Sequence, residues 1–219
     1  MNNEEWERCY TRGLAFFGRV SANVSHEVKN HMAVINELGG LLQDLSLMAR
    51  RKQELDPSRV KDIADNIVDQ ITGCDSIIKA FNYFSHSADQ TIASVDLNEF
   101  AEKMVIITRR LAAIKGAKLL FEPGPEQHLT LFTNPFLLEQ LYYFCLEHMI
   151  SAETADLVIS VSPGKRETSG QLLFSCQKQT ASDIPDHEYT ILLKKMLKAD
   201  TWVSADGKTL VLTIKPLSM

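Results

Sequence analysis

The sequence predicts an α+β protein: a long helical hairpin that pairs with a second copy as a four-helix bundle, followed by an α/β sandwich. Apolar residues at three- and four-residue spacing predict the hairpin, and short β-rich runs between turn residues predict the sandwich. The chain has 219 residues, 45% of them hydrophobic, and is long enough to bury an ordinary core. We place the hairpin at residues 1–90 and the sandwich at residues 91–219.

Two apolar stripes define the hairpin. The first predicts a helix over residues 14–48, and Gly39-Gly40 inside it permits at most a bend, because the stripe resumes in phase at Leu42. Asp56 and Pro57 suit the N-cap and first position of a second helix, which continues to residue 84. Two helices cannot enclose both stripes, so we expect the hairpin to dimerise. The stripe residues are Phe17, Val20, Val24, Val28, Ile35, Leu38, Leu42 and Leu45, then Val60, Ile63, Ile67, Ile71, Cys74, Ile78, Phe81 and Phe84.

The remaining elements alternate helices with short strands. Helices are expected over residues 96–114, 134–152 and 189–198. Strands are expected at LLFE, LVISVS and QLLFSCQ, the last two joined by a loop over residues 163–170. A final hairpin, TWVSADGKTLVLTI, turns at Asp206-Gly207.

Composition argues against several classes of protein. The net charge of -5 is spread along the chain and the one basic cluster is Arg50-Arg51-Lys52, so no nucleic-acid partner is expected. No apolar run approaches the roughly 18–20 residues that span a bilayer, and the N-terminus is too acidic for a signal peptide. We therefore expect a cytoplasmic protein without membrane contact. The four cysteines are scattered, which predicts reduced and mostly buried thiols and no metal site.

The stretch SHEVKNH places two histidines on the first helix. At about 100° per residue, His31 lies about 20° from Val24 and falls on the apolar stripe, where we expect it to pack in the bundle with a hydrogen-bond partner. His26 lies about 160° from Val24 and must face solvent. Two interpretations of His26 stay open on the helix alone: a solvated surface residue, or a group that does chemistry.

The surroundings of His26 favour the chemical interpretation. Glu27 is close enough for its carboxylate to hold one ring N–H and leave the other nitrogen as a nucleophile. A neutral imidazole accepts a phosphoryl group at about pH 7, and such a transfer needs mainly positioning and charge placement. The face around His26 is small and polar, so a second protein can dock there. We expect this partner to contact Arg19, Ala22, Asn23, Lys29, Ala33 and Glu37.

The run Val24-Ser25-His26-Glu27-Val28-Lys29-Asn30-His31-Met32 resembles the H-box of bacterial sensor histidine kinases, except that His31 stands where the family has proline. The resemblance implies that His26 is the phospho-accepting histidine and Glu27 its acid/base neighbour. It also implies that Asn30 helps to position water for phosphatase activity, and that the hairpin is dimeric.

The second half resembles a histidine-kinase ATP-binding domain that has degenerated. In TNPFLLEQLYYFCLEHMISAE, at the place of the N-box, Gln140 matches, while Phe144 and His148 replace the asparagines that hold Mg²⁺ and nucleotide phosphates in the family. No glycine stands between Gly170 and Gly207, so the glycine boxes are missing. Asp183 is the one candidate for the adenine-contacting aspartate, and a surface Asp beside a turn is the alternative.

These resemblances imply a phosphorelay histidine phosphotransferase. His26 is expected to take a phosphoryl group from the receiver domain of one response regulator and pass it to another, without ATP. No cofactor is expected in the chain itself, since the receiver supplies Mg²⁺; the expected partners are receiver domains and a second copy. Three alternatives stay open: an ATP-dependent kinase with divergent nucleotide boxes, a non-catalytic protein that binds receivers or kinases, and a phosphatase that uses Asn30.

Overall fold

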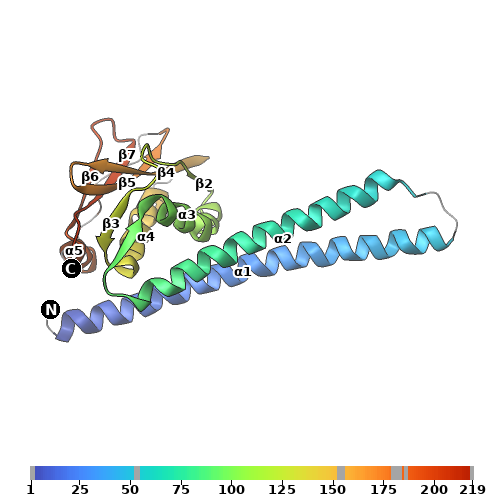
Figure 1. Ribbon diagram of the computed structural model, residues 1–219, viewed down its shortest axis with the longest axis horizontal. Coiled ribbons are helices and arrows are strands. Elements are labelled where there is room, and N and C mark those ends of the chain that lie inside the picture. The colour runs from blue at the N-terminus through green and yellow to red at the C-terminus, as the bar shows by residue number, and fades with distance from the viewer. Residues whose placement is uncertain (1–2, 52–54, 152–155, 179–183, 185–186, 218–219) are drawn as a thin grey trace.

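The computed structural model describes residues 3–51, 55–151, 156–178, 184 and 187–217. Two long helices, α1 (Asn3–Arg50) and α2 (Pro57–His86), form a hairpin that projects from an α/β domain, and both termini lie at the end opposite the hairpin tip (Figure 1). The predicted α+β fold, with its long hairpin followed by an α/β sandwich, is confirmed. The pairing with a second copy stays a prediction.

The α/β domain is a mixed sheet with helices packed against it (Figure 1). Its elements are η1 (Ser87–Asp89), β1 (Ala93–Asp96), α3 (Leu97–Ile114), β2 (Ala117–Phe121), β3 (Thr130–Thr133), α4 (Pro135–Ser151), β4 (Leu157–Arg166), β5 (Ser169–Cys176), α5 (Glu188–Leu197), β6 (Ala199–Val203) and β7 (Thr209–Ile214). Five strands follow the order β2-β4-β5-β7-β6, with β2 and β4 parallel and the other pairs antiparallel. β1 and β3 form a separate antiparallel pair.

The hairpin helices follow from local sequence signals. Asp56 caps α2 and accepts a hydrogen bond from the backbone N–H of Ser58 at 2.9 Å, with Pro57 in the first turn. α1 continues unbroken through Gly39-Gly40. It also starts well before the predicted residue 14, because this part of the helix packs against the α/β domain: a Cβ added to Gly13 would lie 3.0 Å from the Phe136 ring of α4.

Two details of the sheet differ from the prediction. β1 and β3 were not predicted, since four residues each give too short a pattern to separate a strand from a loop. The predicted loop over residues 163–170 is wrong: β4 runs through Pro163 to Arg166, and the chain reverses in a tight turn at Glu167, where φ is 56°. Pro163 lies beyond residues 157–161, the part of β4 that pairs with β2, and proline is tolerated at such edge positions.

One hydrophobic core runs from the sandwich into the base of the hairpin. The Phe16 side chain is 3% exposed, and its ring centroid lies 5.5 Å from that of Phe84 in α2 and 5.2 Å from that of Tyr143 in α4. Aromatic pairs at such distances stabilise a core beyond their burial alone. The N-terminal half of α1 is therefore fixed against both α2 and the α/β domain.

The cysteines agree with the expected reduced thiols. Cys74, Cys145 and Cys176 are free, and the last two are buried. The side chain of Cys9 lies outside the described residues.

Candidate functional site

His26 lies exposed on α1, about three helical turns after the core residue Phe16. The helix is uninterrupted on both sides, so the imidazole stands on a rigid backbone. The residues expected to meet a partner share this face. Arg19, Ala22, Lys29, Asn30, Ala33 and Glu37 are exposed, and Asn23 is half-buried. An approaching protein would meet small and polar side chains around an accessible ring nitrogen.

Glu27 lies on a different side of α1. Around the helix, Glu27 is about 20° from Phe16, so it lies on the side of α1 that faces the α/β domain. His26 is about 80° from Phe16 and lies next to that side. Oε2 of Glu27 is buried and has no hydrogen-bond partner among the described residues. This oxygen therefore does not hold the His26 ring in this structure. Burial raises the pKa of Glu27, and the charges of Arg110, His31 and Arg109 oppose that rise.

His31 packs across the hairpin, as its place on the apolar stripe predicts. Its Nδ1 lies 2.7 Å from Oε1 of Gln70 in α2, so the expected hydrogen-bond partner is present. Gly73 makes room for the ring: a Cβ at this position would lie 2.8 Å from Cε1 of His31. His31 thus joins α1 to α2 within the hairpin and does not belong to the surface proposed to meet a second protein.

Arg19 lies on the His26 face and also contacts the α/β domain. Its guanidinium carbon lies 5.5 Å from the ring centroid of Tyr143 in α4, a cation–π contact. Burial and the neighbouring Glu147 raise the pKa of Tyr143 to about 12, and Arg19 opposes this rise. Arg19 therefore marks the border between the face of α1 around His26 and the surface of α4.

The positions of α4 that correspond to the N-box meet aromatic and polar side chains. The Tyr189 hydroxyl of α5 donates a hydrogen bond to Oε1 of the buried Gln140. The Phe144 ring lies 5.8 Å from the Tyr189 ring at an interplanar angle of 67°, and the guanidinium of Arg12 in α1 lies 5.2 Å from the same Tyr189 ring. Tyr189 is thus enclosed by α1, α4 and its own helix.

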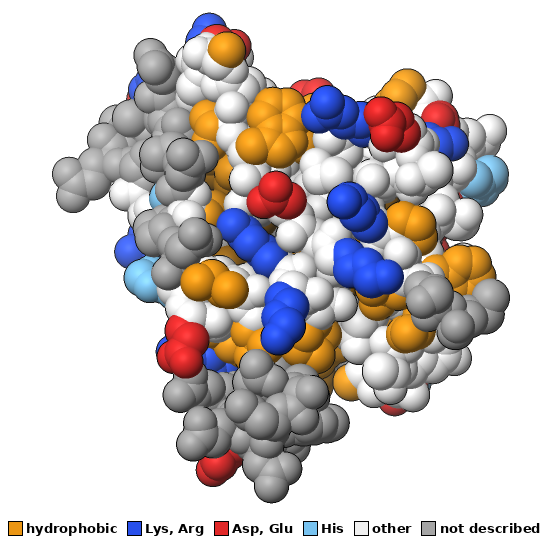
Figure 2. Space-filling model, turned by 90° about the vertical axis from the view of Figure 1, so that its left-hand side faces the viewer, with side chains coloured by type: hydrophobic (Ala, Val, Ile, Leu, Met, Phe, Trp, Pro, Cys, Tyr) orange, Lys and Arg blue, Asp and Glu red, His pale blue; other side chains and the backbone are white. Residues whose placement is uncertain are grey.

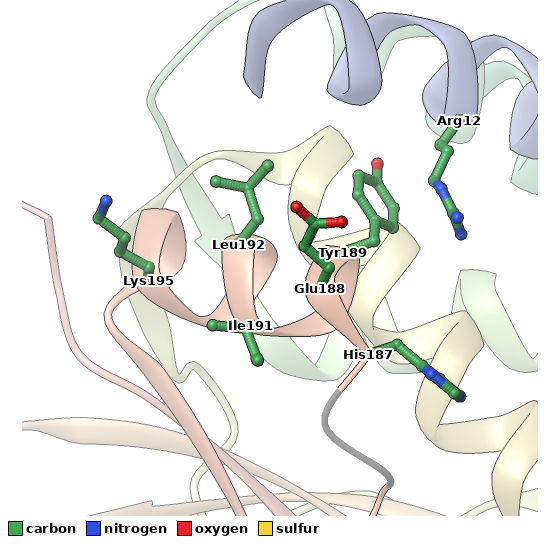
Figure 3. Close-up of a pocket in the computed structure, with 7 residues that line it drawn as sticks. All are labelled: Arg12, His187, Glu188, Tyr189, Ile191, Leu192 and Lys195. Atoms are coloured by element: carbon green, nitrogen blue, oxygen red, sulfur yellow. The ribbon is translucent and has the colours of Figure 1, made fainter. Parts of the chain in front are cut away.

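A pocket of about 670 Å³ adjoins Tyr189. Figure 3 shows Arg12 from α1 and His187 from the start of α5 extending into the same space. Lys and Arg side chains also gather on the end of the molecule that Figure 2 shows. A carboxylate, Glu188, stands in the first turn of α5, where it disfavours an anion at the helix N-terminus. The lining residues are Arg12, His187, Glu188, Tyr189, Ile191, Leu192 and Lys195.

Several expectations concern absences or lie outside the described residues. Among the residues described, no group of three or more His, Cys, Asp or Glu side chains is arranged to hold a metal ion. His148 is half-buried in α4. Asp183 lies outside the described part of the chain. Of the helices that the structure describes, none combines the length and apolar character required to cross a bilayer.

Three neighbours of the site were not identified from the sequence. The positive charges of Arg109 and Arg110 in α3 oppose the rise in the pKa of Glu27. Tyr189 of α5 contacts the N-box position Phe144. The only sequence feature that could have pointed to them is the pair of adjacent arginines in the helix over residues 96–114. Such pairs are ordinary on solvent-facing helices and do not by themselves indicate a site.

In architecture, a helical hairpin followed by an α/β domain, the chain is similar to solved structures of histidine kinases. One is the Acinetobacter baumannii histidine kinase AdeS, with 12% sequence identity, 84% of this chain and 96% of that chain covered, and a TM-score of 0.47. Another is histidine kinase ThkA in complex with response regulator protein TrrA, with 16% identity, 98% and 66% covered, and a TM-score of 0.45. A third is a bacterial phosphotransferase, with 12% identity, 92% and 96% covered, and a TM-score of 0.46. No protein-family model and no curated protein matches the sequence.

Proposed function

We propose that this chain is a histidine phosphotransferase of a cytoplasmic two-component phosphorelay, in which His26 carries the phosphoryl group and ATP takes no part. The observation that carries the proposal is the exposed imidazole of His26 on an unbroken helix, within a run that resembles the kinase H-box. A neutral imidazole at about pH 7 has one ring nitrogen free to attack phosphorus.

The proposed transfer has two steps. A ring nitrogen of His26 attacks the phosphorus of an aspartyl phosphate in one receiver; the N–P bond forms, the P–O bond breaks, and the carboxylate leaves. The carboxylate of a second receiver then attacks the phosphohistidine, and the N–P bond breaks. Because phosphoryl transfer passes through a loose transition state, the rigid helix has mainly to position the ring, and Mg²⁺ arrives with the receiver.

The surroundings of α4 support a reaction without ATP. Phe144 offers no oxygen to Mg²⁺ at a position where the kinase family has asparagine, and its ring packs on Tyr189. The amide of Gln140, the one N-box residue that matches the family, is engaged by the Tyr189 hydroxyl. The carboxylate of Glu188 adds a negative charge at the start of α5.

The hairpin supports the proposal of a homodimer with receiver domains as further partners. Several large apolar side chains of α1 and α2 stay exposed in the single chain, as expected of a surface that meets another helix pair. Examples are Leu41, Leu47, Val60, Val68 and Ile71.

The test is to incubate the chain with a ³²P-labelled, phosphorylated receiver and, separately, with labelled ATP and Mg²⁺. We expect label on the chain from the receiver and none from ATP. His26→Gln should take no label, whereas His128→Gln, a change at another exposed histidine, should label as the unmodified chain does. Label from ATP alone would contradict the proposal in favour of a kinase. Receiver binding without label would favour a non-catalytic regulator, and loss of receiver phosphate through Asn30 without label would favour a phosphatase.

A further inference from the structure

A stripe of exposed residues on α1 leads from the α/β domain to His26. Arg12, Ala15, Arg19, Ala22 and His26 follow one another at spacings of three and four residues, and all five are exposed. At about 100° per residue they lie within about 80° of one another around the helix. At about 1.5 Å per residue, Arg19 stands about 10 Å from His26 along the helix axis and Arg12 about 21 Å. The two arginines and the imidazole therefore share one face of α1.

A groove of about 320 Å³ lies between this stripe and α4, where α1 passes the α/β domain (Figure 1). This volume is at the lower end of the range for small-molecule pockets, and aromatic rings line much of the groove, so it suits a side chain of another protein better than a nucleotide. The charged groups that line it are two arginines and one carboxylate, which leaves a net positive charge. The residues on its two sides are Arg12, Ala15 and Arg19 of α1, and Tyr143, Phe144 and Glu147 of α4.

Aromatic rings of the α/β domain hold both arginines at the groove. The guanidinium carbon of Arg19 lies 5.5 Å from the ring centroid of Tyr143, and that of Arg12 lies 5.2 Å from the ring centroid of Tyr189 (Figure 3). A cation–π contact uses the flat face of the guanidinium and leaves N–H groups at its edge able to donate. Among the described residues, neither arginine forms an ion pair with a carboxylate. Both are thus positioned to bind carboxylates of a partner.

A receiver domain is the partner that fits this position. A compact domain of about 100 residues has a radius of gyration of about 13 Å and is about 30 Å across. A receiver centred on His26 therefore covers Arg19 and reaches toward Arg12. The surface that it turns to His26 also carries the Mg²⁺ for the transfer, and Mg²⁺ is held mainly by carboxylates and other oxygen ligands. Such an acidic surface is complementary to a groove with two arginines.

We propose that the groove between α1 and α4 is a docking site for the receiver that exchanges its phosphoryl group with His26. One apolar side chain of the receiver enters the groove against Tyr143 and Phe144, and carboxylates beside it pair with Arg19 and Arg12. This inference rests on the proposed function of His26. It gives the α/β domain a part in choosing the receiver, because the groove exists only where α1 and α4 are packed together.

The first measurement is the affinity of the chain for each receiver used in the labelling experiment, followed by calorimetry without phosphorylation. Arg19→Glu should weaken binding by about tenfold or more, because it replaces attraction by repulsion. Ala15→Leu puts bulk into the groove and should weaken binding several-fold. Arg50→Glu and Ala49→Leu make the same changes at exposed positions about 35 Å from His26 along α1, and should bind as the unmodified chain does.

The second measurement separates docking from the chemistry of His26. Phosphoramidate, a small phosphoryl donor that needs no docking, should label His26 at the same rate in the unmodified chain, Arg19→Glu and Ala15→Leu. Transfer from the phosphorylated receiver should show a raised KM in the two variants and little change in kcat. Slower labelling by phosphoramidate, or equal receiver affinity in the unmodified chain and both variants, would overturn the inference.

The outcomes also separate this inference from the proposed function. Receivers that bind the chain and leave His26 unlabelled would contradict the proposed function, and the affinities of Arg19→Glu and Ala15→Leu would still decide whether the groove is their docking site. If the two variants change the self-association of the chain in sedimentation and leave receiver affinity unchanged, the groove belongs to a second copy and the inference is overturned. Absence of binding by every receiver would overturn both.

Discussion

The hydroxyl of Ser87 lies 2.7 Å from the carbonyl oxygen of Phe84 and 2.7 Å from Oε2 of Glu139 in α4. A serine hydroxyl has one proton to donate, and the Phe84 carbonyl can only accept. Ser87 therefore shares its proton between the two acceptors, or Glu139 is protonated and donates to Ser87 Oγ. Glu139 is fully buried, and burial raises its pKa well above the ordinary value. This raised pKa favours the neutral acid in the contact that connects the end of the hairpin to the α/β domain.

This contact predicts that the chain loses stability as the pH rises. Because the pKa of Glu139 is raised in the folded state, its stabilisation is fully present below the ordinary value of 4.5 and is lost as the pH rises toward the folded-state pKa. Glu139→Gln keeps a donor for Ser87 and cannot ionise. At about pH 8 we expect it to increase the free energy of unfolding by about 1 kcal/mol or more and to flatten the pH profile.

Urea unfolding at several pH values measures this effect. Glu99→Gln, at an exposed carboxylate of α3, should keep the pH profile of the unmodified chain. A Glu139→Gln chain that is less stable than the unmodified chain at high pH would show that Glu139 is ionised in the folded state.

Phe16 should decide whether the hairpin and the α/β domain unfold together. Its ring contacts Phe84, Phe136 and Tyr143, one from α2 and two from α4. Phe16→Ala removes these contacts, and we expect a loss of about 3–5 kcal/mol at this junction. Calorimetry should then show two unfolding transitions in place of one. Leu14→Ala, at a side chain that is 60% exposed, should change stability by about 0.5 kcal/mol or less. A single transition in Phe16→Ala would mean that contacts other than those of Phe16 make the hairpin and the α/β domain unfold together.

The contact of His31 with Gly73 predicts opposite effects for two glycine changes. Gly73→Ala places a Cβ 2.8 Å from the His31 ring and must push it away from Gln70, so we expect a loss of about 1–3 kcal/mol. Gly18→Ala, in α1 with no atom within 4 Å of the new Cβ, should gain about 0.5–1 kcal/mol from helix propensity. Thermal unfolding of both variants tests the pair. Equal stabilisation by the two changes would mean that His31 does not pack on Gly73.

Much of the fold could be predicted because its signals are local. The N-cap at Asp56, the long apolar stripes and the turn at Asp206-Gly207 each depend on neighbours in sequence. The early start of α1 could not be predicted, since the helix gains its support from Phe136, far along the chain. The extension of β4 through Pro163 likewise depends on which part of the strand its neighbour covers.

The candidate site likewise has features that could be predicted from the sequence and features that could not. The exposure of His26 and the packing of His31 follow from 100° per residue on a continuous helix. The surroundings of Glu27 do not, because the charge that Arg110 of α3 adds there depends on how α3 packs on α1. The sequence therefore identified the residue proposed to carry the phosphoryl group, whereas only the tertiary structure revealed which charges act on its neighbour.

Transfer through His26 is tested most directly by a pulse and chase between two receivers. The chain is first labelled from one phosphorylated receiver and separated from it, and a second, unphosphorylated receiver with Mg²⁺ is then added. We expect acid-labile label on His26 after the pulse, its loss during the chase, and matching label on the aspartate of the second receiver. If the second receiver becomes labelled just as well by a chain carrying His26→Gln, the phosphoryl group does not pass through this histidine.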